Sequence, residues 1–369
     1  MYFSTIYLVL LSSLHLASPS PFSPPPAKRQ QLDTNSTQWQ TLAPIPTYPR
    51  QEHTTVFLPP STIVILGGII PANDTTVFPP VLTTPIMQFY SIPNNTWTTP
   101  NATSPAPMPH ALNHLNAAVV DDKIYVLGGM QETNTPSLGR AWRGTPSSYM
   151  YDPEADTWTP LPAGLAAADE TRGSAAVGVY NATIFLAGGV TDLEFYGNAS
   201  QRSVRAVSAF DTVSRSWVAL PEKARNLPEA RDHAGAAVVG SKMYILGGRA
   251  FGQENVKDTV FVLDLEDLAA GWRTSSARMP TARGGVSTGV VGTKVYTLGG
   301  EGNVGSESGV FNEVEVFDTV DECWEAVDEG MKVPRHGTYA VGVGDRVYVP
   351  GGGIMQSGAP VDDFDVFVV

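Results

Sequence analysis

Short apolar runs that end in a Gly-Gly pair recur along this chain. In the fourth repeat, two apolar runs, residues 234–239 and 243–246, lie on either side of a Gly-Ser-Lys turn, and Gly247-Gly248 ends the second run. Two further runs, residues 259–264 and 271–273, complete the repeat. Because β-branched and aromatic residues bounded by Gly, Asp and Asn are typical of strands, each repeat predicts four short strands, here called a, b, c and d. The pairs begin at six glycines: Gly67, Gly128, Gly188, Gly247, Gly299 and Gly351.

A tryptophan follows each of the first five pairs at a similar distance. The spacings from the first glycine are 30, 30, 29, 25 and 25 residues, to Trp97, Trp158, Trp217, Trp272 and Trp324. The sixth pair has no such tryptophan, whereas Trp39 precedes the first pair by 28 residues. We therefore expect the segment around Trp39 to complete the last repeat beside residues 363–368, which closes a ring of six four-stranded units. Residues 30–369 show no sustained helical period, so the expected fold is an all-β, six-bladed propeller.

These features resemble the kelch family of repeat proteins. The resemblance rests on the Gly-Gly pairs after an apolar run, on the tryptophan downstream, and on Asp-Pro or Asp-Thr turns such as Asp152-Pro153 and Asp318-Thr319. It rests also on the tyrosine before four of the pairs, at Tyr125, Tyr244, Tyr296 and Tyr348. The resemblance covers about residues 39–369 and implies a six-bladed kelch β-propeller, distantly similar to galactose-oxidase-type propellers but without the copper site.

The long connections of the repeats fall on one face of the predicted propeller. In a meander, the b–c and d–a connections leave the sheet on the same side, because strand direction alternates. The a–b turns on the opposite side are short, whereas the b–c connections include residues 69–84, 130–147 and 190–203. Binding residues concentrate on long loops over a rigid scaffold, so this long-loop face is the predicted ligand face.

Cationic and titratable side chains gather at the d–a junctions of this face. Four arginines lie 16 residues before the first glycine of their pair, Arg50 lies 17 before it, and Leu112 takes the place in the second repeat. An arginine offers a planar fork of donors to an acidic group, and kelch propellers that bind ligands use arginine near this position. The same arginines could instead cap carbonyl groups of the blades, and both interpretations stay open. The predicted ligand-binding residues are Arg50, Arg172, Arg231, Arg283, Arg335, His53, His336, Trp142 and Arg249.

Histidines outside the N-terminal segment all lie in these junctions, at His53, His110, His114, His233 and His336. Histidine transfers protons near neutral pH, so His233 and His114 are candidate catalytic bases, with Glu301 as the candidate acid. The alternative for His233 is a hydrogen-bonded structural residue. Trp142, the one tryptophan outside the repeat register, is either a loop anchor or a stacking surface for a ligand.

No contiguous metal, nucleotide or nucleophile motif supports other chemistry. Residues 285–289 match G-x-S-x-G but lie in a predicted strand without a following helix, so the nucleophile-elbow context is absent. We therefore expect no metal and no cofactor. The two function classes are a propeller that binds a small or acidic ligand or a partner on the long-loop face, and a cofactor-free isomerase, lyase or rearrangement catalyst. The resemblance to fungal kelch-like proteins implies for the second class a place in secondary-metabolite, for example polyketide, biosynthesis.

Composition and the N-terminal segment indicate a secreted monomer. The net charge of -13 makes a non-specific nucleic-acid or anionic-membrane partner unfavourable. Residues 1–17 predict a signal peptide and residues 18–29 a Pro-rich propeptide that ends in Lys28-Arg29, so the propeller occupies residues 30–369. Cys323 is the only cysteine, which excludes an intramolecular disulfide. Glycosylation is predicted at six Asn-X-Ser/Thr sequons: Asn35, Asn73, Asn94, Asn101, Asn181 and Asn198.

Overall fold

The computed structural model describes residues 30–31, 38–74, 79–98, 105–135, 139–162, 171–194 and 201–369. Every regular element within these ranges is a β-strand, which confirms the predicted all-β class. Within the same ranges, no helix has the length and apolarity needed to cross a membrane. The predicted leader and propeptide, residues 1–29, lie outside the described residues.

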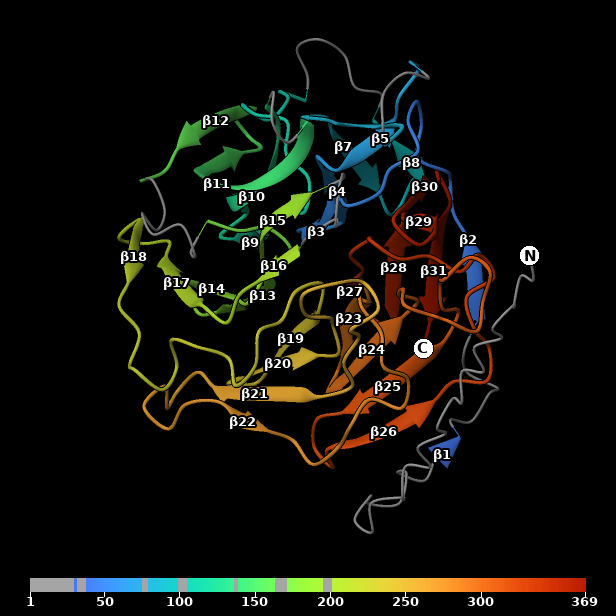
Figure 1. Ribbon diagram of the computed structural model, residues 1–369. Coiled ribbons are helices and arrows are strands. Elements are labelled where there is room, and N and C mark those ends of the chain that lie inside the picture. Colours follow the sequence, from blue (N-terminus) through green and yellow to red (C-terminus); the bar gives the residue numbers. More distant parts are fainter. Residues whose placement is uncertain are drawn as a thin grey trace, which may run out of the picture.

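Most strands belong to antiparallel sheets that follow the a–b–c–d order of the sequence repeat. Figure 1 shows these sheets arranged around a common centre, each with its first strand innermost. Four of them have strands in plain chain order: β3 (Thr54–Leu58), β4 (Thr62–Leu66), β7 (Met87–Ser91) and β8 (Thr96–Trp97); β13 (Ala176–Tyr180), β14 (Thr183–Ala187), β17 (Val207–Asp211) and β18 (Ser216–Val218); β19 (Gly235–Val239), β20 (Lys242–Leu246), β21 (Val260–Asp264) and β22 (Arg273–Thr274); β23 (Ser287–Val291), β24 (Lys294–Leu298), β25 (Val314–Asp318) and β26 (Cys323–Ala326).

Two more sheets depart from this plain order. One contains β9 (Ala117–Val120), β10 (Lys123–Thr135), β11 (Gly139–Asp152) and β12 (Thr157–Pro160) in chain order, and two strands of the following repeat, described below, are added beside β11. The other joins β27 (Val341–Val343), β28 (Arg346–Pro350) and β31 (Phe364–Val368) to β2 (Gln38–Thr41), where Trp39 is paired with Phe367. The segment around Trp39 therefore pairs with the last strand of the chain, as its spacing predicts. The backbone of β1 (Gln30–Gln31) runs parallel to β26.

The long b–c connections form β-ribbons instead of the predicted loops. In the first, β5 (Ile69–Pro71) pairs with β6 (Val81–Thr83). In the second and third, β10 and β11 extend beyond the sheet, and β15 (Val190–Glu194) pairs with β11 and with β16 (Gln201–Ser203). A shorter ribbon, β29 (Gly353–Met355) with β30 (Gly358–Pro360), follows the sixth pair. Pairing satisfies backbone hydrogen-bonding groups of the described ribbon strands.

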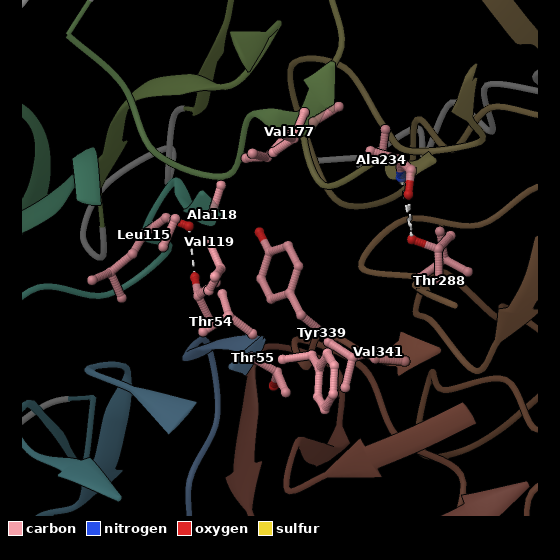
Figure 2. A pocket seen from close by; sticks show the side chains of 18 residues that line it. Thr54, Thr55, Leu115, Ala118, Val119, Val177, Ala234, Thr288, Tyr339 and Val341 are labelled. Carbon is pink, nitrogen blue, oxygen red and sulfur yellow. Dashed lines mark hydrogen bonds between the residues drawn. The ribbon is translucent and has the colours of Figure 1, made fainter. Parts of the chain in front are cut away.

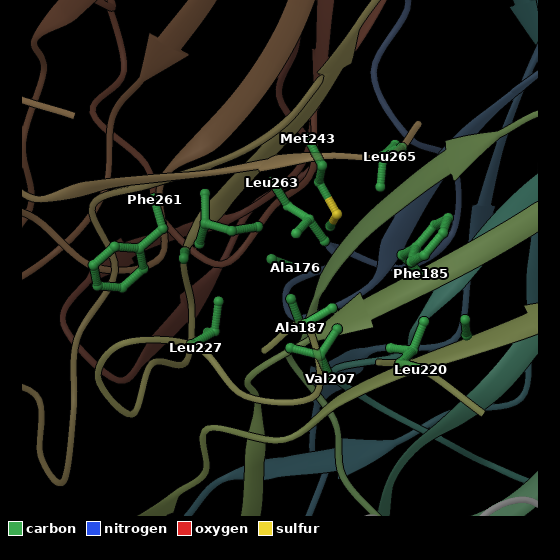
Figure 3. Close-up of a cluster of buried hydrophobic side chains, with 14 residues drawn as sticks. Ala176, Phe185, Ala187, Val207, Leu220, Leu227, Met243, Phe261, Leu263 and Leu265 are labelled. Atoms are coloured by element: carbon green, nitrogen blue, oxygen red, sulfur yellow. The ribbon is translucent and has the colours of Figure 1, made fainter. Parts of the chain in front are cut away.

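Neighbouring sheets pack through apolar side chains on their facing surfaces. Figure 3 shows one such cluster, in which Phe185 of β14 and Val207 of β17 lie close to Met243 of β20 and Leu263 of β21. Met243 and Leu263 have no exposed surface. Burial of each large apolar side chain contributes about 1.5–3 kcal/mol, so these interfaces supply much of the free energy that holds the sheets together.

The Gly-Gly pairs are needed because neighbouring sheets approach closely there. The Gly189 N–H donates to the carbonyl of Arg231 in the next junction at 2.7 Å. Gly188 has a φ of +66°, and a Cβ at this position would lie 2.2 Å from the same carbonyl oxygen. The Gly352 N–H likewise donates to the Arg50 carbonyl at 2.7 Å, which connects the sixth Gly-Gly pair with the first junction. A side chain at these glycines would separate the sheets.

Candidate functional site

One residue from each d–a junction lies at the centre of the long-loop face. We call Glu52, His114, Ser174, His233, Gly285 and Gly337 the axial ring. All six have a left-handed φ between 49° and 60°. The backbone N–H of each donates to the carbonyl of the ring residue before it, at 2.6–3.3 Å, and the series returns from Glu52 to Gly337. The ring holds its side chains in fixed positions, and four of those side chains are polar.

A cavity of about 320 Å³ opens above this ring. Ring residues Glu52 and His114 line it together with Arg249, Glu301 and His336. Its apolar part is formed by ribbon residues Ile69, Pro79, Trp142 and Leu193. A volume of this size, with apolar walls and a few fixed polar groups, is typical of a small-molecule site.

The first polar pair in this cavity joins two axial-ring residues. His114 Nε2 lies 3.1 Å from Glu52 Oε2, and both side chains are buried. The other ring nitrogen, Nδ1, lies 2.5 Å from Asn113 Oδ1. Asn113 is oriented by its Nδ2, which donates to Thr83 Oγ1 at 2.8 Å. The His114 ring is therefore held on both sides.

The second polar group is a buried ionic network around Arg249. The guanidinium contacts Asp232 Oδ1 through Nε at 3.2 Å and hydrogen-bonds Glu301 through Nη1. Arg249 Nη2 lies 3.2 Å from His233 Nε2, and His233 Nδ1 lies 2.5 Å from Asp232 Oδ1. His336 Nδ1 is 3.5 Å from Glu301 Oε2. Each of these side chains is at most 2% exposed.

Burial shifts the pKa values of this network. Burial, reinforced by Arg249, lowers the pKa of His114 to about 3 and also lowers the pKa of His233, so both rings are neutral near pH 7. Burial alone would raise the pKa of Glu301, but His336 and Arg249 outweigh it and lower that pKa to about 2. Glu301 is therefore an ionised acceptor, and its environment does not suit a general acid.

The five register arginines are directed into the sheets. Each is at most 1% exposed. Arg50 Nη1 donates to the Gly67 carbonyl at 2.8 Å, and Arg172 Nε donates to the Gly188 carbonyl at 2.5 Å. Arg231, Arg283 and Arg335 make equivalent contacts with Gly247 O, Glu315 Oε2 and Asp365 Oδ2. A guanidinium that is fully buried and bound in this way cannot reach a ligand above the face. The structure therefore supports the alternative in which these arginines cap carbonyl groups, and two of them also bind buried carboxylates.

The other predicted site residues are divided between cavity and core. Arg249, Glu301, His114, His336 and Trp142 all line the cavity. His233 lies behind Arg249, in the small space of about 10 Å³ that it shares with Glu52 and Tyr339. His53 is fully buried beside Thr338 and away from the cavity. Trp142 packs with Ile69 and Val190, and its ring lies tilted against that of His114 with centroids 5.4 Å apart. This packing supports the loop-anchor alternative, and stacking on a ligand stays a prediction.

A separate channel of about 280 Å³ runs along the inner strands below the axial ring. Figure 2 shows the Tyr339 ring projecting into it among small and β-branched side chains such as Ala118 and Val177. Thr54 and Leu115, which follow the ring in the sequence, also line the channel. Ser287 of the G-x-S-x-G match is buried and donates to the Thr338 carbonyl at 2.8 Å, so it has a structural contact there.

Several site residues were not predicted from the sequence. Glu52, Asp232 and Asn113 are polar partners of the two ring histidines, and Gln51 lines the cavity. The sequence contains a pattern that could have identified Glu52. It stands two residues after its register arginine, as His233 does. Its one-residue offset in the first repeat concealed that equivalence.

Comparison with known proteins identifies the family of this fold. A family model described as the KLHDC2/KLHL20/DRC7 Kelch-repeats domain matches residues 145–352, and a kelch motif model matches residues 112–163. The chain is 38% identical to Kelch-like protein terF of Aspergillus terreus over 339 residues, which cover 88% of this chain and 68% of that protein.

Two other relatives cover less of the chain. It is 26% identical to Alpha-scruin of Limulus polyphemus over 58% of this chain and 21% of that protein. It is 28% identical to an N-(sulfonatooxy)prop-2-enimidothioate sulfolyase of Thlaspi arvense over 31% of this chain and 32% of that enzyme. The sequence repeat, the strand meander and these similarities show that the chain belongs to the kelch-repeat family.

Proposed function

We propose that this protein binds a small molecule in the cavity above the axial ring. The observation that supports this proposal is the set of buried, mutually oriented polar groups at the base of a cavity with an apolar wall. Burying three carboxylates and a guanidinium costs folding free energy, and residues in such environments cluster at functional sites. As the scaffold we propose a closed six-bladed kelch propeller, supported by the β2–β31 pairing and by the hydrogen bonds of the axial ring.

The charges of the cavity favour a neutral or basic ligand. Glu52, Asp232 and Glu301 provide three buried carboxylates, and Arg249 is the one guanidinium among the groups that contact them at this site. An acidic ligand would meet this excess of negative charge in a poorly solvated space. We therefore propose a compact, largely apolar ring system that carries hydrogen-bond donors and no negative charge.

A thermal-shift screen of the purified protein tests this proposal. Neutral aromatic, basic and acidic compounds of matched size are compared at pH 7. A compound present at 100 times its dissociation constant should stabilise the fold by about 2.7 kcal/mol, and we expect such compounds among the neutral and basic sets. Stabilisation by acidic compounds alone would contradict the proposed ligand class.

Acid–base catalysis at His114 is a second candidate function. His114 faces the cavity and is oriented by Asn113, so its position would allow it to take a proton from a bound ligand. The partial similarity to a sulfolyase is consistent with catalysis on a kelch scaffold, and the fungal relative keeps the expectation of a role in secondary metabolism open. Turnover of a compound that binds, abolished in His114→Asn with binding retained, would distinguish an enzyme from a binding protein.

We also propose that the protein is secreted and glycosylated. Among the six sequons, Asn73, Asn94 and Asn181 are exposed, which an acceptor site requires, and Asn35, Asn101 and Asn198 lie outside the described residues. Protein recovered from the medium of a eukaryotic host should lose mass on treatment with an N-glycosidase. An unchanged mass would exclude glycosylation in that host.

A further inference from the structure

We propose that Glu52, His114 and His233 together bind one divalent transition-metal ion at the base of the cavity. Each residue offers one ligand atom, these atoms lie within 4.8 Å of one another, and all three residues are buried. They come from three different junctions, so no contiguous motif marks them. The proposal concerns the base of the cavity and does not depend on the organic ligand proposed above.

Both histidines are oriented as metal ligands usually are. Asp232 Oδ1 lies 2.5 Å from His233 Nδ1, and Asn113 Oδ1 lies 2.5 Å from His114 Nδ1. These acceptors place the ring proton on Nδ1, which leaves the lone pair of Nε2 available. Metal-binding histidines almost always donate their other ring N–H to a carboxylate or carbonyl in this manner.

The contact between His114 and Glu52 lacks a proton in this tautomer. With Nδ1–H directed at Asn113, Nε2 and Glu52 Oε2 are two acceptors that face each other at 3.1 Å. A cation between them would turn this unfavourable contact into two metal–ligand bonds. The alternative is a proton shared between the two groups, which makes His114 an imidazolium in a buried position.

The buried charges beside these ligands also favour a cation. Three buried carboxylates, Glu52, Asp232 and Glu301, face one guanidinium, that of Arg249. A divalent ion would offset this excess of buried carboxylates. In addition, Gln51 lines the same cavity, is 1% exposed, and its Oε1 has no hydrogen-bond partner among the described residues. An oxygen of this kind is available as a further ligand or as an acceptor for a metal-bound water.

Arg249 must give up one contact when the metal binds. Its Nη2 lies 3.2 Å from His233 Nε2, the nitrogen that would bind the ion. The guanidinium remains bound to Asp232 and Glu301 through its other nitrogens, so only this hydrogen bond is exchanged. Two imidazole nitrogens and one carboxylate suit zinc or ferrous iron and do not suit magnesium, which prefers oxygen ligands.

Calorimetric titration of the full chain, free of a histidine tag and stripped with a chelator, tests the site with Zn²⁺ and with Mg²⁺ as the comparison ion. We expect one Zn²⁺ per chain and no measurable Mg²⁺ binding. His114→Asn and His233→Asn should each weaken Zn²⁺ binding by about 100-fold or more, because loss of an outer partner alone costs 10–100-fold. Asparagine is chosen because it tolerates the left-handed φ of both positions, and Glu52→Gln completes the set.

Two further variants separate this proposal from others. His110 lies exposed in the same junction as His114, so His110→Asn should bind Zn²⁺ like the wild type. Leu193→Trp fills the apolar part of the cavity and should abolish organic ligands while leaving Zn²⁺ binding intact. Absence of Zn²⁺ binding by the folded wild type, or unchanged binding in the His114, His233 and Glu52 variants, would overturn the proposal. Because a bound metal occupies His114 Nε2, the titration also decides between a metal ligand and a free base at that residue.

Discussion

The register arginines stabilise the sheets from inside. Arg283 illustrates the arrangement, because its Nη2 contacts Thr297 Oγ1 at 3.0 Å and Glu315 Oε2 at 3.2 Å in the same sheet. Arg283 has no exposed surface, and the Glu315 side chain is only 2% exposed. A repeat of similar sheets therefore explains a repeat of arginines without any ligand.

Replacement of such an arginine should cost much stability. Arg283→Met leaves the Glu315 carboxylate buried without its partner, so the free energy of unfolding should fall by about 3–5 kcal/mol in urea titrations. Arg278 lies in the same junction, but its side chain is 58% exposed, and Arg278→Ala should stay within about 0.5 kcal/mol of the wild type. Equal effects of the two changes would show that Arg283 has no special structural role.

His53 makes stability depend on pH. Burial, together with the charge of Arg50, lowers its pKa from 6.5 to about 3. The unfolded chain therefore takes up this proton below pH 6.5 while the folded chain does not, so stability falls as pH decreases from about 6.5 towards 3. The contribution of His53 is about 2 kcal/mol between pH 7.5 and pH 5. In His53→Gln this part of the slope should disappear, and a slope equal to that of the wild type would contradict the assignment.

At the scale of elements, the axial ring depends on its left-handed backbone. Gly285 and Gly337 share nearly the same φ, 60° and 59°. A Cβ at Gly337 would lie 2.3 Å from Glu52 Oε1, whereas a Cβ at Gly285 would first meet the Gly337 nitrogen at 3.4 Å. Equivalent positions of the ring thus differ in the space that they leave.

Alanine substitutions at these two glycines separate backbone strain, which both would cause, from displacement of the Glu52 side chain, which only Gly337→Ala would cause. Both Gly285→Ala and Gly337→Ala should lose about 1–2 kcal/mol, because alanine is strained in the left-handed region. Gly337→Ala should lose more and should also weaken Zn²⁺ binding, because its methyl group displaces Glu52. Equal thermal stability and equal Zn²⁺ affinity of the two variants would contradict the proposed role of Glu52.

The strand order could be predicted from the sequence, the site only in part, and the ribbons not at all. The predicted strands 234–239, 243–246 and 259–264 agree with β19, β20 and β21 within one residue. Turn residues such as Gly240 and Gly247 mark where these strands end. The ribbon strands include polar stretches such as residues 131–135 and 201–203, which do not show the apolar pattern of the sheet strands. Of the predicted site residues, Arg249, Glu301, His114, His336 and Trp142 line the cavity, but the five register arginines do not. Burial and the direction of the side chain decide whether an arginine contacts a sheet or a ligand. A register position fixes neither of these properties.

At the scale of the whole molecule, strand β2 near the N-terminal end of the described chain pairs with β31 at its C-terminal end. Trp39 of β2 is 7% exposed and packs edge-on against Phe367 of β31, with ring centroids 5.1 Å apart. Without β2, the backbone of β31 would be an unpaired edge. Strand β2 is therefore a structural part of the fold.

Loss of the contact between Trp39 and Phe367 should lower the stability of the whole fold. Trp39→Ala should lower the free energy of unfolding by about 3–5 kcal/mol, because it removes a large buried aromatic side chain. Val320, which is 71% exposed in a turn, provides the control, and Val320→Ala should be nearly neutral. A neutral effect of Trp39→Ala in thermal unfolding would show that the β2–β31 contact does not support the fold.

The central claim is that the cavity above the axial ring binds a small molecule. Two leucines on the same face allow a matched test: Leu193 lines the cavity, whereas Leu82 of β6 is 40% exposed outside it. The decisive measurement is the calorimetric dissociation constant of a compound selected in the thermal-shift screen, for the wild type, Leu193→Trp and Leu82→Trp. We expect Leu193→Trp to raise the constant more than 10-fold, or about 1.4 kcal/mol, and Leu82→Trp to leave it unchanged. An unchanged constant in folded Leu193→Trp would contradict the claim.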